Sequence, residues 1–212
     1  MKKYTTIIWD FNGTLVDDVN AALGAVNDML IRRNQPVITL DDYSRNVDIP
    51  IWKFYEKVFV SGSITPEEAI SEFDTGYEKY LKPYPVMENA VAVLDYFNSL
   101  EKTQLIVSAS HIDKVTARLK DLKLYSYFTD VLAMSDYNCG DKTFLAQQYL
   151  SVNNISPDDV VVIGDCVADW QMAQALRCDC ILNTKGHQCR RELSVTDAVI
   201  IDSLTELKNY IE

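Results

Sequence analysis

The stretch IIWDFNGTLVDD, residues 7–18, decides how the chain folds and where its chemistry lies. An apolar run typical of a buried strand ends at a carboxylate, Asp10, and a turn follows at once. In open α/β sheets, ligands bind beyond the carboxyl ends of the strands, so Asp10 stands where a reactive group is expected. The next polar side chain is Asn12, an amide that does not exchange protons near neutral pH.

The overall composition is that of an ordinary globular protein. With 212 residues, 48% of them hydrophobic and 24% charged, the chain suits one large α/β domain or a core domain with an insert. A net charge of −11 argues against non-specific binding to nucleic acid, and we find neither a signal peptide nor a membrane-spanning run. We therefore expect a cytoplasmic protein, a monomer or a homodimer, without nucleic-acid or membrane partners.

The five cysteines indicate neither a disulfide framework nor a zinc site. Their number is odd, and the pair in RCDC, residues 177–180, has one intervening residue instead of two. We expect reduced thiols that pack as small hydrophobic side chains.

Apolar runs rich in β-branched residues alternate with helical patterns along most of the chain. Such continuous runs suit strands that are covered on both faces. The alternation predicts a doubly wound, Rossmann-like parallel sheet with right-handed crossovers. The predicted strands are Thr5–Trp9, Gln104–Ser108, Asp130–Met134, Val160–Gly164, Cys180–Asn183 and Ala198–Ile201. The predicted helices between and after them are 88–100, 112–122, 143–150, 168–176 and 203–210.

The interval 16–83 departs from this alternation, because it shows helical patterns at 18–33, 51–60 and 66–81 and no convincing buried strand. We predict that it is an all-helical cap domain, and that 1–15 and 84–212 together form the α/β core domain. Candidate ligand contacts in the cap are Tyr43, Arg45, Trp52, Phe54 and Tyr55, although aromatic residues at helical spacing more often form a helix core.

Chemically useful side chains follow several of the predicted strands. The first strand ends at Asp10, the second at Ser108 with Ala109 behind it, and the fourth at Asp165, with Asp169 four residues later. Lys142 opens the helix after the third strand. A carboxylate nucleophile, a hydroxyl, an ammonium group and acidic ligands for a hard cation are the groups that phosphoryl transfer requires.

Four motifs carry a resemblance to a known family: DFNGTLVD at 10–17, IVS at 106–108, Lys142, and GDCVAD at 164–169. In this order and with a helical insert, they resemble the haloacid dehalogenase superfamily, in particular its phosphoglycolate-phosphatase-like branch with a helical cap of the C1 type. The resemblance covers the chain from Thr5 to its last helix. It implies a Mg²⁺-dependent phosphohydrolase that acts on a small phosphorylated metabolite through an aspartyl-phosphate intermediate.

The resemblance also implies roles for individual residues. Asp10 attacks phosphorus and binds Mg²⁺ together with Asp165 and the backbone carbonyl of Asn12, while Asp169 orients these metal ligands. The phosphoryl oxygens are held by Ser108 and Lys142. Backbone N–H groups around Phe11, Gly13 and Ala109 form an anion nest, and Thr14 steadies the turn.

Asn12 departs from the family pattern, in which this position carries a second aspartate that gives a proton to the leaving group. Such proton transfer contributes about two to four orders of magnitude. Three explanations stay open: the leaving group needs little protonation, another group such as His111 or His187 supplies the proton, or the protein binds a phosphorylated ligand without efficient turnover. For Asp17 and Asp18 we expect only a favourable interaction with the dipole of the following helix.

Overall fold

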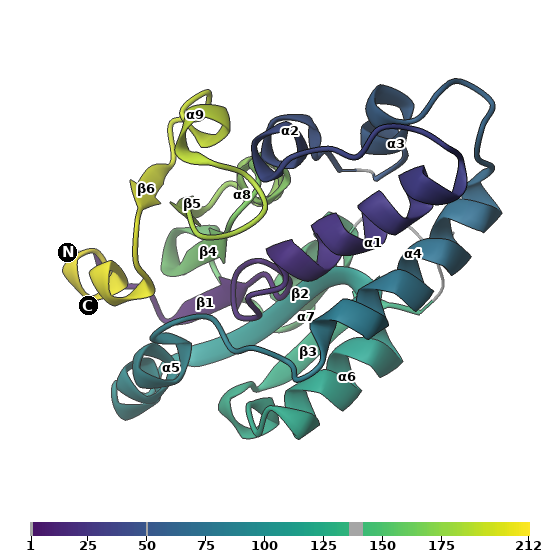
Figure 1. Cartoon of the computed structure of the whole chain (residues 1–212). Coiled ribbons are helices and arrows are strands. Elements are labelled where there is room, and N and C mark those ends of the chain that lie inside the picture. Colours follow the sequence, from purple (N-terminus) through teal and green to yellow (C-terminus); the bar gives the residue numbers. More distant parts are fainter. Residues whose placement is uncertain (1, 50, 136–141) are drawn as a thin grey trace.

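A computed structural model describes residues 2–49, 51–135 and 142–212. Its centre is a six-stranded parallel sheet with the strand order β3-β2-β1-β4-β5-β6 (Figure 1). The strands are β1 Thr6–Trp9, β2 Thr103–His111, β3 Asp130–Met134, β4 Val160–Gly164, β5 Asp179–Asn183 and β6 Val199–Ile201. The predicted doubly wound parallel sheet is confirmed.

Helices connect these strands and cover the sheet. The α-helices are α1 Val19–Arg32, α2 Leu40–Asn46, α3 Trp52–Val58, α4 Pro66–Leu81, α5 Ala90–Ser99, α6 Ile112–Asp121, α7 Lys142–Val152, α8 Val167–Leu176 and α9 Arg190–Leu193. The 3-10 helices are η1 Tyr125–Tyr127, η2 Pro157–Asp159 and η3 Leu204–Asn209.

The central strands alternate their side chains between two hydrophobic clusters. Ile7 and Trp9 of β1 face the cluster that contains α5, α6 and η3, whereas Ile8 faces the cluster that contains α7 and α8. Because successive side chains of a strand point to opposite faces, an unbroken apolar run fills both clusters. This two-sided burial fixes β1 in the middle of the sheet, so that Asp10 emerges between β2 and β4.

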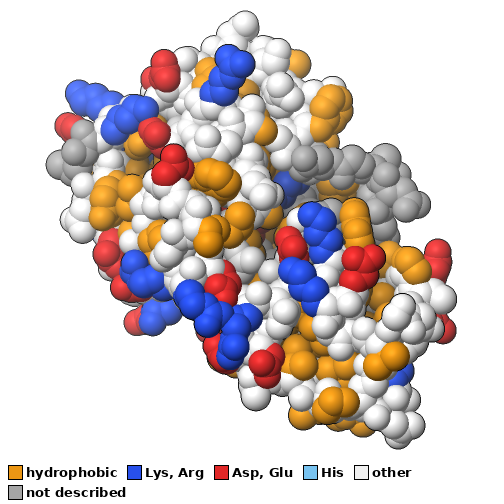
Figure 2. Space-filling model, turned by 90° about the horizontal axis from the view of Figure 1, so that it is seen from above, with side chains coloured by type: hydrophobic (Ala, Val, Ile, Leu, Met, Phe, Trp, Pro, Cys, Tyr) orange, Lys and Arg blue, Asp and Glu red, His pale blue; other side chains and the backbone are white. Residues whose placement is uncertain are grey.

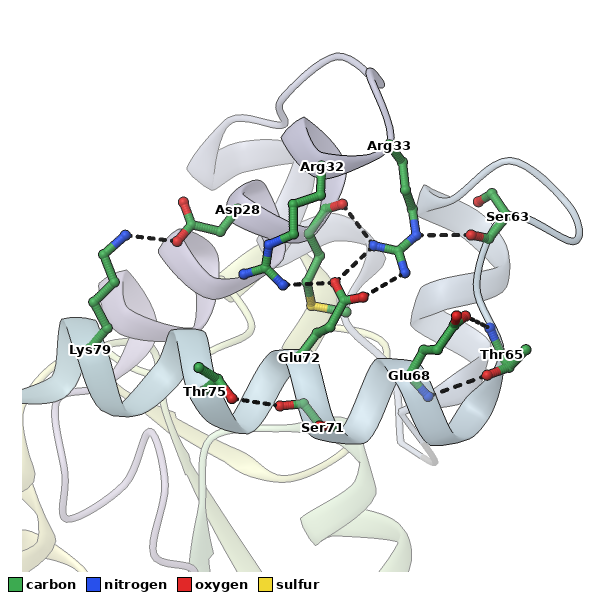
Figure 3. A network of polar contacts seen from close by, with 11 residues as sticks. Asp28, Arg32, Arg33, Ser63, Thr65, Glu68, Ser71, Glu72, Thr75 and Lys79 are labelled. Atoms are coloured by element: carbon green, nitrogen blue, oxygen red, sulfur yellow. Dashed lines mark hydrogen bonds and ion pairs between the residues drawn. The ribbon is translucent and has the colours of Figure 1, made fainter.

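Helices α1 and α4 form the main pair of the helical block between β1 and α5. Figure 3 shows the polar contacts along this pair: Arg33 of the α1 C-cap forms two hydrogen bonds with Glu72 of α4, and Lys79 lies 2.9 Å from Asp28. Helix α4 begins at Pro66 as predicted, because Thr65 and Glu68 form a capping box at its start. The hydrophobic cluster on the α5 side of the sheet continues without a break into this block.

Two ion pairs join α4 to α6, the helix that follows β2. Lys114 Nζ lies 2.6 Å from Asp74 Oδ2, and Arg118 pairs with Glu78 one turn further along both helices. The guanidinium group of Arg118 also lies over the ring of Tyr77. These contacts hold α4 beside the carboxyl edge of the sheet. The division into a core domain and a cap domain of residues 16–83 stays a prediction.

Some local predictions differ from the structure. The sequence reading missed α2 and α9, which have only 7 and 4 residues, and the last predicted helix, 203–210, is the 3-10 helix η3. Strand β2 continues past Ser108 to His111 across an irregularity in its pairing with β3. The four described cysteines are free thiols, and Cys139 lies outside the described residues.

The molecular surface mixes both signs of charge. Figure 2 shows one face on which acidic and basic side chains lie interspersed, with hydrophobic side chains between them. Among the described residues, no helix combines the length and the apolar character that crossing a membrane would require.

Candidate active site

Asp10, Lys142 and Asp169 meet at the carboxyl edge of the sheet. The ammonium group of Lys142, at the start of α7, lies 2.6 Å from Asp10 Oδ1 and 2.6 Å from Asp169 Oδ1. The other oxygen of Asp169 accepts hydrogen bonds from the backbone N–H groups of Asp165 and Cys166, at the start of α8. Asp169 therefore holds both the turn after β4 and the lysine, and its role in orienting metal ligands stays a prediction.

Asp165 completes this group, which we call the carboxylate cluster (Asp10, Asp165, Asp169 and Lys142). Thr14 Oγ1 donates to Asp165 Oδ1 over 2.9 Å, and the backbone N–H of His187 donates to Oδ2 over 2.6 Å. Gly13 has a positive φ of 78°, and a Cβ there would lie 2.4 Å from Asp165 Oδ2. The first loop can therefore approach Asp165 only with glycine at this position.

The carboxylate cluster holds three buried carboxylates and one ammonium group, which pairs with Asp10 and Asp169. Burial raises the pKa of Asp10 to about 8 despite the nearby Lys142, and repulsion from Asp169 and Asp165 adds to the rise. Burial likewise raises the pKa of Asp165 to about 6. For Lys142, burial alone would lower the pKa, but Asp10 and Asp169 outweigh it and raise the pKa well above its usual value.

The cluster fits a hard divalent cation. Ligand atoms of Asp165, Cys166 and Asp169 lie within 4.8 Å of one another, and carboxylate oxygens are the ligands that Mg²⁺ prefers. Burial keeps the pKa of the Cys166 thiol well above its usual value, so this group stays protonated and is a poor ligand. The surplus of negative charge on the carboxylates is what a cation would neutralise.

Asn12 belongs to a second polar group, which we call the amide network (Asn12, Asp18, Tyr77 and His187). The side-chain amide of Asn12 donates to Asp18 Oδ2 over 2.8 Å and to the Tyr77 hydroxyl over 2.7 Å. Its oxygen accepts from Ser110 Oγ over 2.9 Å. Tyr77, on α4, also donates to Asp18 Oδ2.

Asp18 is the centre of the amide network. Its Oδ1 accepts from the backbone N–H of Gly13 over 2.7 Å and lies 3.3 Å from His187 Nε2. Its side chain makes no capping hydrogen bond to α1 and is 1% exposed, whereas Asp17 is exposed. The expectation of a mere dipole interaction was therefore wrong for Asp18, whose carboxylate turns away from its own helix and binds the first loop.

Burial and ion pairing oppose each other in the amide network. Burial alone would raise the pKa of Asp18, but His187 and the hydrogen-bond donors around it lower the pKa overall. Burial alone would lower the pKa of His187, but Asp18 raises it to about 9. Both groups are therefore charged at neutral pH, and the imidazolium neutralises the carboxylate.

The loop Gly186–Cys189 connects the site to α2. The Tyr43 hydroxyl lies 2.9 Å from His187 Nδ1, and the Gln188 side chain donates to the Val47 carbonyl and accepts from the N–H of Val167. The N–H of Cys189 donates to Ser44 Oγ. Helix α2 and its C-cap therefore contact the loop that follows β5, although the sequence patterns did not predict this helix.

The remaining predicted site residues lie on the same edge. Ser108 is buried and accepts a hydrogen bond from the N–H of Ser110, while Ala109 is exposed. The N–H of Gly13 donates to Asp18 and to the Val16 carbonyl, so its place in an anion nest is not seen here and stays a prediction. His111 caps α6 by accepting from the N–H of Asp113.

The candidate contacts from the helical block separate into two groups. Tyr43 reaches the site through His187, whereas Phe54 and Tyr55 pack in the hydrophobic core. Trp52 is exposed, and Arg45 pairs with Asp41. We did not single out Tyr77 or the site role of Asp18 from the sequence.

Comparison with known proteins identifies one matching family and several solved structures of similar fold. Residues 7–183 match the family described as haloacid dehalogenase-like hydrolase. A haloacid dehalogenase-like family hydrolase from Streptococcus pneumoniae has a TM-score of 0.85 and 18% identity, with 98% of each chain covered. A predicted phosphatase from Clostridium acetobutylicum has a TM-score of 0.79 and 21% identity, covering 99% of this chain and 98% of that one.

A third solved structure, described as a predicted phosphoglycolate phosphatase from Haemophilus somnus, has a TM-score of 0.77 and 15% identity, with 99% of each chain covered. At these identities the three structures show a shared fold. Among curated proteins, none matches the chain.

Proposed function

The chain belongs to the haloacid dehalogenase-like hydrolase family, as its motifs indicated, and we propose that it is a Mg²⁺-dependent phosphohydrolase acting on a small phosphorylated metabolite in the cytoplasm. The observation that carries this proposal is the carboxylate cluster, in which Asp10 and Asp165 follow adjacent strands and Lys142 pairs with Asp10 and Asp169. A nucleophilic carboxylate beside an ammonium group and a cation site is the arrangement that phosphoryl transfer needs.

In the proposed reaction, Asp10 attacks phosphorus and forms an aspartyl-phosphate, which water then hydrolyses. Lys142, with its ammonium group 2.6 Å from Asp10 Oδ1, holds the nucleophile in place and binds phosphoryl oxygens together with Ser108. The cation would be held by Asp10, Asp165 and the backbone carbonyl of Asn12, and Asp169 would orient these ligands. When bound, Mg²⁺ supplies positive charge that keeps Asp10 ionised and offsets the charge of the phosphoryl group.

The amide network supports a second candidate function. Because Asn12 cannot transfer protons and its amide is bound to Asp18 and Tyr77, a protein that binds a phosphorylated metabolite without efficient turnover has the same geometry. In that case the carboxylate cluster would serve binding only.

A panel of small phosphorylated metabolites with Mg²⁺ separates the two functions. The phosphohydrolase releases inorganic phosphate from at least one compound, and this release stops when Mg²⁺ is chelated. A compound that raises the melting temperature of the protein but releases no phosphate would support the binding function instead. The absence of both responses across the panel would contradict both functions.

A further inference from the structure

The side chains near the position that would protonate a leaving group already use their protons in hydrogen bonds within the protein. Each amide hydrogen of Asn12 has an acceptor, Asp18 Oδ2 or the Tyr77 hydroxyl, and the amide oxygen accepts from Ser110. Asn12 thus has no free donor to offer and no proton to transfer. The Tyr77 hydroxyl in turn donates its hydrogen bond to Asp18.

His187, the candidate replacement donor, is equally committed. Its Nε2 faces Asp18 Oδ1 at 3.3 Å and its Nδ1 faces the Tyr43 hydroxyl at 2.9 Å. Both ring nitrogens therefore have partners inside the protein. The other histidine, His111, points its Nδ1 at the N–H of Asp113. Asn12 and His187, the two groups beside Asp18, therefore offer the leaving group no free proton, and His111 serves as the cap of α6.

This arrangement suits a leaving group that departs without a proton. An alcohol is about as weak an acid as water, whose pKa is about 15.7, so an alkoxide needs protonation as it leaves. Carboxylic acids have a pKa of about 4, and a carboxylate leaves as the stable anion. Attack by Asp10 on an acyl phosphate also exchanges one carboxylic-phosphoric anhydride for another, so the first step is close to thermoneutral.

We infer that the site is selective for acyl phosphates, compounds in which the phosphoryl group is joined to a carboxylate. This inference rests on the proposed phosphohydrolase function and specifies its substrate class. In the first step, the bond from an Asp10 oxygen to phosphorus forms, the bond from phosphorus to the acyl oxygen breaks, and the carboxylate leaves with the electron pair. In the second step, water attacks phosphorus, the Asp10 carboxylate is released, and both water protons stay on the dihydrogen phosphate that forms.

The amide at position 12 affects the second step as well, because it cannot act as a base. Without a base to activate water, hydrolysis of the aspartyl-phosphate is slow for every substrate, so kcat reports this shared step. By contrast, kcat/KM reports the first step, in which the leaving group departs. The two constants therefore separate leaving-group selectivity from turnover.

The test measures kcat/KM of the wild-type protein with Mg²⁺ for acetyl phosphate, 4-nitrophenyl phosphate, phenyl phosphate and ethyl phosphate. We expect a steep fall as the leaving group becomes more basic, with acetyl phosphate preferred over ethyl phosphate by at least about 10²-fold, because no acid assists the alcohols. Rapid mixing with acetyl phosphate should also show phosphoryl-protein accumulating before steady turnover.

A double substitution, Asn12→Asp with Asp18→Asn, sharpens the result. It exchanges the two groups, so that position 12 carries the carboxylate and position 18 carries the amide, and the contact between an amide and a carboxylate is kept. The preference for acetyl over ethyl phosphate should then fall about 10²-fold. The single substitution Asp18→Asn is the matched control, since it alters the network without placing an acid at position 12, and the preference should remain steep.

The outcomes separate the inference from the function on which it rests. A flat dependence of kcat/KM on the leaving group in the wild-type protein overturns the acyl-phosphate inference and leaves the phosphohydrolase function standing. Failure to release phosphate from acetyl phosphate, while a compound of the metabolite panel is hydrolysed, overturns the inference alone, whereas failure with these four compounds and with the whole panel overturns the phosphohydrolase function as well. The wild-type series decides even if the double variant does not fold.

Discussion

The carboxylate cluster and the amide network lie side by side on the first loop but balance their charges in opposite ways. In the cluster, three buried carboxylates lie together, only Asp10 and Asp169 pair with the ammonium group of Lys142, and burial raises the pKa of Asp10 to about 8. In the network, one carboxylate, Asp18, meets a protonated imidazole and three further donors, and its pKa falls.

The difference indicates which group changes partners during function. Binding of a cation stabilises a cluster that carries surplus negative charge. By contrast, moving any member of a network in which every donor is satisfied costs stability. We therefore assign ligand binding and chemistry to the carboxylate cluster and the positioning of the first loop to the amide network.

Removal of the nucleophile should have the largest effect. The substitution Asp10→Asn should lower kcat/KM for phosphate release by at least about 10⁴-fold, because the aspartyl-phosphate cannot form. The same substitution removes a buried carboxyl of raised pKa, so the melting temperature without Mg²⁺ should stay equal or rise. Activity that survives this substitution would contradict the proposed mechanism.

Placing a second carboxylate in the amide network should lower the stability of the folded protein. The substitution Asn12→Asp places two carboxylates about as close as the present 2.8 Å contact, and we expect a loss of about 3 kcal/mol in the free energy of unfolding near pH 8. Urea titrations should show a smaller loss near pH 5, where one carboxyl binds a proton. Adding Asp18→Asn should restore most of the stability, and strictly additive losses would refute the pairing.

Mg²⁺ should stabilise the protein in a pH-dependent manner. The pKa of Asp10 in the folded protein, about 8, exceeds its unfolded value of 3.8, so the contribution of this group to stability is present below about pH 4 and is lost as the pH rises through 8. Mg²⁺ at a hundred times its Kd should add about 2.7 kcal/mol.

Thermal unfolding with and without MgCl2 checks this prediction. The rise in melting temperature should be greater near pH 8 than near pH 5, since protons compete with the cation for the carboxylates. The variant Asp165→Asn should lose most of the response. An equal rise at both pH values would indicate that Mg²⁺ binds elsewhere.

The smallest effect should come from a single hydroxyl of the network. The substitution Tyr77→Phe removes the donor to Asp18 and the acceptor for Asn12, which should cost about 1–2 kcal/mol of unfolding free energy. Tyr80→Phe on the same helix is the matched control, because its hydroxyl contacts Asp28 at the surface, and it should cost below about 0.5 kcal/mol. Equal losses in the two variants would argue against a buried network.

The sequence predicted the sheet and the carboxylate cluster well, for reasons that are local. Strand β1 reads as a continuous apolar run because both its faces are buried. Each carboxylate of the cluster directly follows a strand or opens a helix, and parallel strands bring these ends to one edge. The start of α4 was predictable because Thr65, Pro66 and Glu68 act within four consecutive residues.

The amide network was not predictable in this way, because its members interact across long separations. Asp18 and Tyr77 are 59 residues apart, and the sequence does not indicate which face of α4 meets the first loop. An aspartate at the start of a helix also looks the same whether its side chain serves the helix or turns away from it. Helix α2 also escaped notice, although Thr39 and Asp42 form a capping box that marks its start in the sequence.

The contact between Asn12 and Asp18 also constrains how this protein can evolve. A change of Asn12 to an acid alone passes through a variant with two facing carboxylates, and a change of Asp18 alone leaves the His187 imidazolium without its counter-ion. Each single step should lower stability even if the double step does not, which would be sign epistasis between positions 12 and 18. Natural variants that carry an acid at position 12 should therefore differ at position 18 too.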